Sequence, residues 1–224
     1  MSGKRSRHVA IGVAAATALL VTSISAAPAA AQRSSCTGDY TPIYDIQGDG
    51  SSSPSDGEVV TTEGVVTVDL QMTSELRGFF IQDLGGDGDP TTSDGIFVFH
   101  QDTWSPTFDP DAGDIVRITG TVDEFFGNTQ IGRLQSGEYC GTSPVRPQQT
   151  QPRRFNANPE QFEGMYVQFT GNLSVTDTFN LHRFGEVWLA DDGVVEQPTN
   201  EFPADAPDAP AAAADGIAQS ILLD

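Results

Sequence analysis

The stretch from residue 58 to residue 134 constrains the fold most, because its apolar residues alternate in five separate runs. The runs are EVVTTEGVVTVDL (58–70), GFFIQD (78–83), GIFVFH (95–100), DIVRITGTVDEFF (114–126) and NTQIGRL (128–134). Such alternation, rich in β-branched residues, is typical of half-buried strands. The two long runs contain an interior glycine, Gly64 and Gly120, which marks a bulge or a bend. Since small barrels need bent strands, we expect an all-β chain with an OB-type five-stranded barrel over residues 36–142.

Residues 1–31 have the pattern of a secretory signal peptide. A basic start with Lys4, Arg5 and Arg7 precedes the apolar run VAIGVAAATALLV, and small residues stand before Gln32. The run is too short and too rich in alanine for a comfortable membrane span. We therefore predict a secreted, extracellular protein with no stable membrane association after cleavage of the leader.

The charge balance is strongly acidic. The chain has 11 Lys and Arg against 31 Asp and Glu; removal of the three basic residues of the leader leaves 8 against 31, a net charge of −23 without any lysine. This charge repels phosphate backbones at a distance, which argues against tight, non-specific binding of nucleic acid. A local binding groove is compatible with it.

Two cysteines, Cys36 and Cys140, bracket the five runs. An even pair that flanks one domain of an exported chain favours a disulfide. A reactive thiol or metal pair is the alternative, but neither cysteine has a histidine or further cysteine near it in sequence.

The connection between the second and third runs is rich in acids that could bind Ca²⁺, since hard cations prefer oxygen ligands. These acids are Asp83, Asp87, Asp89 and Asp94. An EF-hand loop that begins at Asp87 would need Glu where Val98 stands. A solvated hairpin loop without metal is the alternative.

The second and third runs are apolar on both faces, so one face fills the barrel and the other is available to stack bases or to pack against a neighbouring unit. OB-folds use the face of strands 2–3 and the flanking loops for nucleic acid. The residues that we expect to bind nucleic acid there are Arg77, Phe79, Phe97, Phe99, Arg117, Phe125 and Phe126. We expect no catalytic residue, because His100 and His182 stand in none of the common catalytic motifs.

A second unit follows a linker at residues 143–157. An offset of 107 residues aligns Gly57 with Gly164, Gly64 with Gly171 and Gly78 with Gly185, together with several apolar positions. This indicates a second OB-like β unit at residues 158–195, whose completeness the sequence leaves open; chance similarity of two hairpins is the alternative. Residues 196–224 are expected to be a Pro/Ala/Asp-rich linker and the start of a truncated downstream region, with a strand beginning at the final ILLD.

Several motifs together resemble the N-terminal region of large secreted bacterial nucleases. They are IYDIQGDGSSSP, EGVVT, GFFIQD, GDGDPTTSDGIFVF, GDIVRITGTVDEFFGNTQI, FEGMYVQF and NLHRFGEVWLA, and the resemblance covers about residues 43–224. Those proteins carry OB-like domains ahead of a metal-dependent endonuclease/exonuclease/phosphatase domain. The resemblance implies that the catalytic residues, and the Mg²⁺ or other divalent metal they need, belong to a domain beyond Asp224.

The function that follows is that of a non-catalytic accessory region of a secreted nuclease that hydrolyses extracellular DNA or RNA. Its expected partners are extracellular nucleic acid and the downstream catalytic domain. Two alternatives stay open: an independent OB-type binding module for nucleic acid or polysaccharide, and a calcium-stabilised structural β module.

Overall fold

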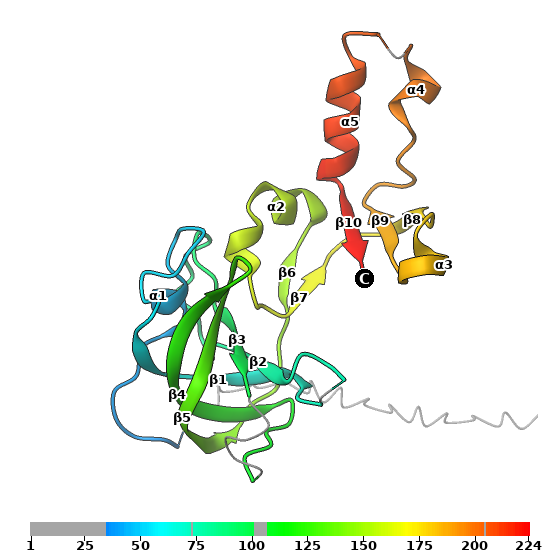
Figure 1. Ribbon diagram of the computed structural model, residues 1–224. Helices are drawn as coiled ribbons and strands as arrows, with labels where there is room; N and C mark the ends of the chain where they lie inside the picture. The colour runs from blue at the N-terminus through cyan, green and yellow to red at the C-terminus, as the bar shows by residue number, and fades with distance from the viewer. Residues whose placement is uncertain (1–34, 73, 101–106, 204) are drawn as a thin grey trace, which may run out of the picture. The chain divides into compact units, whose positions relative to one another are not determined.

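The computed structural model describes residues 35–224, apart from residues 73, 101–106 and 204. Five strands form a closed barrel in the order β1-β2-β3-β5-β4, with β1 also paired to β4 (Figure 1). The strands are β1 (Val59–Leu70), β2 (Gly78–Gln82), β3 (Gly95–Phe99), β4 (Asp114–Phe125) and β5 (Asn128–Thr142). All pairings are antiparallel except that of β3 with β5. The five predicted strands are confirmed, and β5 continues past its predicted end at residue 134.

The inner face of the barrel is lined by the aliphatic side chains that alternate along its strands. Along β4 the side chains of Val116, Ile118 and Val122 are completely buried, as the sequence pattern predicts. On β2 and β3 the core side chains are Phe79, Ile81, Ile96 and Val98, each fully buried. The opposite faces of these two short strands therefore carry the remaining aromatic residues outward.

The two interior glycines stand where the strands change direction. At Gly120 the pairing of β4 with β5 shifts register, and an added Cβ would lie 2.6 Å from Ile131. Directly after Gly64, at Val65, strand β1 passes from its pairing with β4 to its pairing with β2, and its bulge follows between Val66 and Val68. The bulge turns Val68 outward, to 39% exposure, although simple alternation predicts that it shares the face of Val66.

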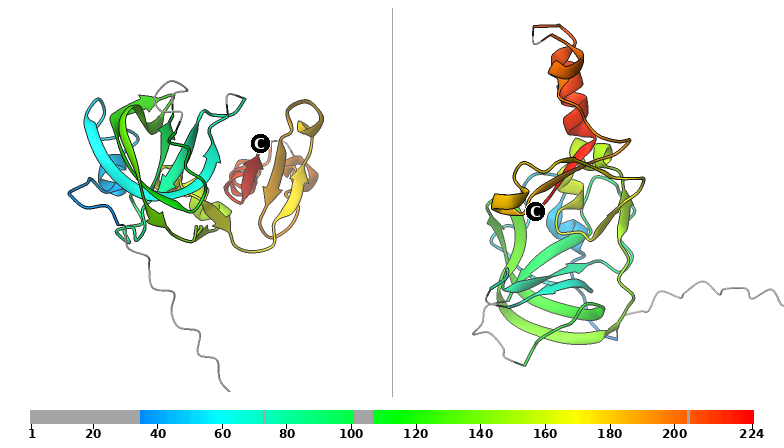
Figure 2. Two further views of the ribbon diagram at one scale, coloured as in Figure 1. Left: turned by 90° about the horizontal axis from the view of Figure 1, so that it is seen from below. Right: turned by 90° about the vertical axis from the view of Figure 1, so that its right-hand side faces the viewer.

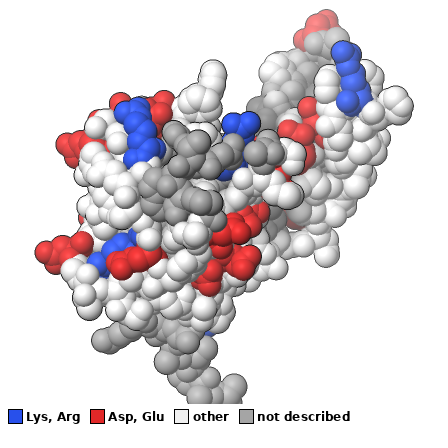
Figure 3. Space-filling view, turned by 60° about the horizontal axis from the view of Figure 1, so that its bottom comes forward, with Lys and Arg blue, Asp and Glu red and all other residues white. Residues whose placement is uncertain are grey.

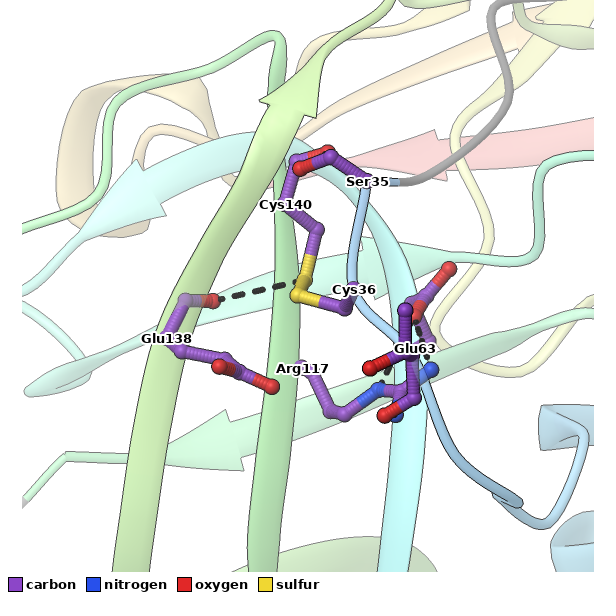
Figure 4. Close-up of a disulfide and its surroundings, with 7 residues drawn as sticks. Ser35, Cys36, Glu63, Arg117, Glu138 and Cys140 are labelled. Atoms are coloured by element: carbon purple, nitrogen blue, oxygen red, sulfur yellow. Dashed lines mark hydrogen bonds and ion pairs between the residues drawn. A yellow bond between two sulfur atoms is a disulfide. The ribbon is translucent and has the colours of Figure 1, made fainter.

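The seam between β1 and β4 is held by a buried ion pair. Glu63 and Arg117 are directly paired across the two strands, and their side chains join at 2.8 Å with relative exposures of only 4% and 9% (Figure 4). Arg117 also donates to the carbonyl of Thr37 at 2.7 Å, and its guanidinium lies 5.4 Å from the Tyr40 ring centre. This arginine thus ties the segment before the barrel to the seam.

The predicted disulfide between Cys36 and Cys140 is confirmed and lies close to the ion pair (Figure 4). It joins the segment that precedes the barrel to β5. Ser35 reinforces the junction, since its backbone N–H and its hydroxyl both bond the carbonyl of Cys140. A disulfide is the bond expected in an oxidising compartment.

The segment before β1 packs into the barrel as a short helix. Helix α1 (Ile43–Gln47) presents Ile43 and Ile46 to the core, and both are fully buried. The buried Gln47 amide donates to the carbonyl of Gly95 at 2.6 Å, which fastens the helix to the start of β3. The chain is consequently mostly β rather than all-β, with 37% of it in strands and 18% in helices.

The residues after the barrel form short elements. They are β6 (Gln148–Thr150), α2 (Pro152–Ala157), the 3-10 helix η1 (Pro159–Phe162), β7 (Val167–Phe169), β8 (Ser174–Asp177), α3 (Leu181–Phe184), β9 (Val187–Ala190), α4 (Pro198–Glu201), α5 (Ala209–Ala218) and β10 (Ser220–Leu223). Strands β6 and β7 pair in parallel, and β8, β9 and β10 form an antiparallel sheet (Figure 2).

Two stretches predicted as linkers are ordered. Residues 143–157 contain β6 and α2, and residues 196–224 contain α4 and α5 besides the expected strand at the final ILLD. The alanine-rich composition that suggested disorder favours α5, because alanine is the best helix former. Helix α5 is also fastened at its side, where Arg153 bonds Asp215 at 2.6 Å.

Backbone hydrogen bonds recur at the offset of 107 residues. The bonds from Gly48 N to Tyr44 O, from Asp56 N to Ser53 O and from Glu58 N to Ser55 O are matched by those from Phe155 N to Gln151 O, from Glu163 N to Glu160 O and from Met165 N to Phe162 O. Each of the two helices also carries an amide that bonds the first residue of a later strand, although these amides are not at the 107-residue offset. Gln47 of α1 donates to Gly95, the first residue of β3, and Asn156 of α2 donates to Ser220, the first residue of β10, at 2.7 Å.

The strands that follow these helices correspond as well. The β8–β9 pairing contains a bulge between Val175 and Asp177, as the β1–β2 pairing does between Val66 and Val68, and β10 pairs with β9 as β3 pairs with β2. Residues 152–223 thus share with residues 43–99 a helix, a turn and three antiparallel strands, but they also contain β7, α3, α4 and α5, which have no counterparts among the described residues there. Within the described part of the chain, β4 and β5 have no counterparts in this second set.

The leader predicted at residues 1–31 lies outside the described residues. In the part that the structure does describe, no helix is both long enough and apolar enough to cross a bilayer.

Replacing Glu63 by Gln should lower the free energy of unfolding by about 3–5 kcal/mol, because it leaves the Arg117 guanidinium buried without a counter-charge. Urea denaturation measures the change. The matched control is Asp123→Asn, which removes the acid from an exposed pair with Arg133 at 3.7 Å. That change should cost less than about 1 kcal/mol. Equal losses in the two variants would contradict a special role for the buried pair.

Replacing both Cys36 and Cys140 by Ser should lower the free energy of unfolding by about 4–5 kcal/mol, because the cross-link restricts the unfolded chain. The bond spans a sequence separation of 104 residues. Denaturation curves of the wild type with and without reductant check the result, since the reduced wild type should match the double variant. A double variant as stable as the oxidised wild type would show that the cross-link is dispensable.

Candidate functional site

The outer face of β2 and β3 forms the floor of an apolar pocket of about 460 Å³. This volume lies within the range of roughly 300–1,000 Å³ that is usual for small-molecule sites. The residues that line it are Leu76, Phe80, Phe97, Phe99, Phe125, Phe126, Asn128, Thr129, Gln130, Glu163 and Gly164. They come from the β1–β2 connection, the two short strands, the β4–β5 hairpin and the turn before β7. We call this site the aromatic pocket.

The floor of the aromatic pocket is fixed by strand pairing. Phe80 and Phe97 are cross-strand partners, so their side chains share one face, and their ring centres are 4.8 Å apart. Next to them Gly78 leaves room for the Phe97 ring, because a Cβ there would lie only 2.4 Å from it. The aromatic floor is therefore built into the sheet.

The rim of the aromatic pocket is a strained hairpin tip. Phe126 and Gly127 join β4 to β5 with positive φ angles of 52° and 83°, a conformation that favours Asn or Gly in the first position. A bulky residue there is unusual and costs free energy. Phe126 is nevertheless 91% exposed, with its ring edge-on to Phe125 at 4.6 Å. Its ring therefore stands at the open edge of the pocket.

A single ionisable side chain, Glu163, lines the aromatic pocket. Burial, the largest cause, raises the pKa of its carboxyl, while the hydrogen bond from the Thr129 N–H and the nearby Gln47 amide lower it. The Thr129 hydroxyl in turn donates to Glu124 at 2.8 Å. The acid is therefore held by the β4–β5 hairpin and by α1, although it belongs to the turn before β7.

The structure brings four of the seven predicted nucleic-acid-binding residues together and separates the others. Phe97, Phe99, Phe125 and Phe126 all line the aromatic pocket. Three predicted residues do not line it: Phe79 is fully buried in the core, Arg117 is buried against Glu63, and Arg77 is exposed in the β1–β2 connection. Phe79 points into the core because side chains alternate along a strand and its neighbour Phe80 faces outward.

Sequence reasoning missed Phe80, Leu76 and Glu163. The first could have been found from register, since the outward face of β2 must match that of Phe97 on β3. The second lies in the predicted loop between the first two strands, where no periodicity singles it out. Glu163 follows the barrel in the sequence, and the fold brings it back: Ser93 of the β2–β3 connection, 70 residues earlier, donates to its carbonyl at 2.6 Å. No sequence signal marks that contact.

The four aspartates predicted to bind Ca²⁺ do not converge on one point. Asp83, Asp87 and Asp89 instead accept hydrogen bonds from backbone N–H groups two or three residues ahead, at 2.8–3.1 Å. Among the described residues the acids and other metal ligands that do gather within 4.8 Å are Cys36, Glu138 and Cys140, and both cysteines are oxidised. Calcium binding stays a prediction without a preformed ligand set.

Asp94 differs from the other three aspartates of this connection. Desolvation and the neighbouring charges of Asp83 and Asp87 raise the pKa of its carboxyl to about 6. Its buried Oδ1 atom has no hydrogen-bond partner. The folded protein therefore bears a cost for the ionised form of this side chain.

Basic residues are few and scattered on the surface. Figure 3 shows them as separate spots on one face rather than as a continuous patch. Arg133 lies 3.7 Å from Asp123, and Arg153 bonds Asp215. Such isolated, partly neutralised charges do not form a track for a phosphate backbone.

Comparison of the sequence with protein-family models gives no match, and comparison with curated proteins gives no match either. The geometry of the aromatic pocket therefore carries the functional argument.

Replacing Asp94 by Asn should raise the melting temperature at pH 7.5 but not at pH 4. The folded-state pKa of about 6 lies above the ordinary value of 3.8, so the folded protein binds this proton more tightly and loses stability as the pH rises through that interval. The amide stays neutral, and at pH 7.5 we expect a gain of about 1 kcal/mol after allowance for solvent screening. Calorimetry at the two pH values measures it.

The matched control is Asp89→Asn in the same connection. Hydrogen bonds from Thr91 lower the pKa of the Asp89 carboxyl, so its charge is favoured in the folded protein. This variant should lower the melting temperature at pH 7.5 or leave it unchanged. A gain at pH 4 as large as that at pH 7.5 for Asp94→Asn would refute the charge explanation.

Proposed function

We propose that this chain is a non-catalytic OB-type binding module of a secreted nuclease, and that its aromatic pocket receives a base of single-stranded nucleic acid. Two observations support the OB-type assignment: the strand order of the closed barrel, and the place of the pocket. OB-folds bind oligonucleotides and oligosaccharides on the face of strands 2–3, between the loops after strands 1 and 4. The aromatic pocket lies on that face, with Leu76 from the first loop and Phe126 from the second. The shared elements at residues 152–223 support a second unit of the same type.

The chemistry of the aromatic pocket favours a planar, uncharged group. Its rings supply stacking surfaces, which are worth about 1–3 kcal/mol per base and tolerate any base. No Arg or His is among its lining residues. Binding should therefore depend on stacking more than on phosphate contacts, and the affinity should vary weakly with salt.

The proposed setting is outside the cell, next to an enzyme. The leader pattern and the disulfide suit an exported protein, and the sequence resemblance suggests a downstream metal-dependent phosphodiesterase domain. In this arrangement the module holds substrate while the downstream domain hydrolyses it. The observation that carries the proposal is Phe126, a strained residue that is 91% exposed at the edge of an aromatic floor.

Replacing Phe126 or Phe97 by Ala should weaken binding of a fluorescently labelled oligothymidylate about tenfold or more, because each change removes a stacking surface. Fluorescence anisotropy with purified residues 32–224 measures the affinity. The matched control is Phe179→Ala, which removes a ring that is 89% exposed but lies outside the aromatic pocket. The control should bind like the wild type.

Three other results are informative in the same assay. If Phe179→Ala weakened binding as much as Phe126→Ala, the aromatic pocket would not be the binding site. Displacement of the oligonucleotide by a polysaccharide fragment, with tighter binding of the sugar, would favour the polysaccharide module instead. Hydrolysis by residues 32–224 with Mg²⁺ that survives purification would contradict the non-catalytic role.

A further inference from the structure

Glu163 is an unusual group to find in an otherwise apolar and aromatic pocket. It is the only ionisable side chain among the lining residues, and burial raises the pKa of its carboxyl. Placing a carboxylate against apolar surface costs free energy unless it is well paired. A recognition role would explain why an acid stands at this position.

The position of Glu163 is fixed from several sides. Its carbonyl accepts from the Ser93 hydroxyl at 2.6 Å, and its N–H donates to Glu160 at 3.1 Å. The next residue, Gly164, packs so closely on the start of β3 that a Cβ on Gly95 would lie 2.5 Å from it. These contacts hold the backbone, so the carboxylate is presented to the pocket in advance of any ligand. A preorganised acceptor contributes more to selectivity than a mobile one.

The carboxylate has acceptor capacity left for a ligand. An ionised carboxyl group offers about four lone-pair sites. The N–H of Thr129 donates to it, and the nearby Gln47 amide also favours its ionised form. What remains selects a partner with N–H donors, because a carboxylate accepts hydrogen bonds and donates none.

Among the bases, guanine has the matching edge. Its ring N1–H and exocyclic amino group are two adjacent donors, which suit the two oxygens of one carboxylate. Thymine presents one N–H between two carbonyl oxygens, which a carboxylate repels. Cytosine and adenine each offer a single amino group next to an acceptor nitrogen. Asn128 and Gln130, which also line the pocket, carry side-chain amides of the kind that bond the guanine O6 atom.

We propose that Glu163 makes the aromatic pocket selective for guanine, by accepting hydrogen bonds from its N1–H and its amino group while the base stacks on the phenylalanine floor. This inference rests on the proposed base-binding function. It assigns a role in the pocket of the barrel to a residue of the second repeat, whose counterpart at the 107-residue offset is Asp56.

The test uses a short labelled oligothymidylate and versions with one central dG, dC, dA or deoxyinosine. With wild-type residues 32–224 in an anisotropy assay, the dG version should bind about tenfold tighter than oligothymidylate, because a good two-bond contact discriminates by that order. Deoxyinosine, which lacks the amino group, should lose most of the gain. Glu163→Gln keeps an acceptor oxygen for Thr129 but removes the charge, and it should bring dG to within about twofold of dT.

The outcomes separate this inference from the proposed function. Equal binding of all five probes by the wild type, with loss in Phe126→Ala, would overturn guanine selectivity and leave base binding intact. A dG preference that persists in Glu163→Gln would also overturn the role of the acid. No binding of any probe would overturn both proposals. Melting temperatures of the variants close to that of the wild type would show that the changes act on the pocket rather than on folding.

Discussion

The pairing of β1 with β4 is the constraint on which the rest of the structure depends. It closes the sheet into a barrel, in which β2 and β3 present one face to the core and the other to the aromatic pocket. Glu63 and Arg117 hold the middle of this seam, and the disulfide holds the chain just before it. Closure also removes the free edges that an open sheet of this length would present to other chains.

Much of the barrel was predictable, because each strand is encoded locally. Alternation placed Val116, Ile118 and Val122 inside, and the interior glycines marked irregular pairing. The failures came from long-range effects. Phe79 and Phe80 are adjacent and alike in the sequence, and only the register of β2 against the core decides which of them is exposed. The helix α5 was missed because its proline and aspartate content indicated a linker, although its run of alanines favours a helix.

The candidate site, too, was predictable from the sequence only in part. Its aromatic residues lie in the strand and loop positions that the predicted fold singles out, so four of them could be named beforehand. Its acid could not be named, since Glu163 reaches the barrel through a turn of the following repeat. The hydrogen bonds of this turn match those of the turn before β1, yet it lines the aromatic pocket, whereas the turn before β1 does not.

The close approach of Gly164 to Gly95 also limits where the barrel can be separated from the residues that follow it. A protein cut after Thr142 would keep all five strands of the barrel, but it would leave Gln47, Ser93 and the N–H of Thr129 facing water where the turn now lies. The aromatic pocket therefore includes residues beyond Thr142, where the last strand of the barrel ends. In this chain the residues that complete the aromatic pocket extend beyond those that complete the barrel.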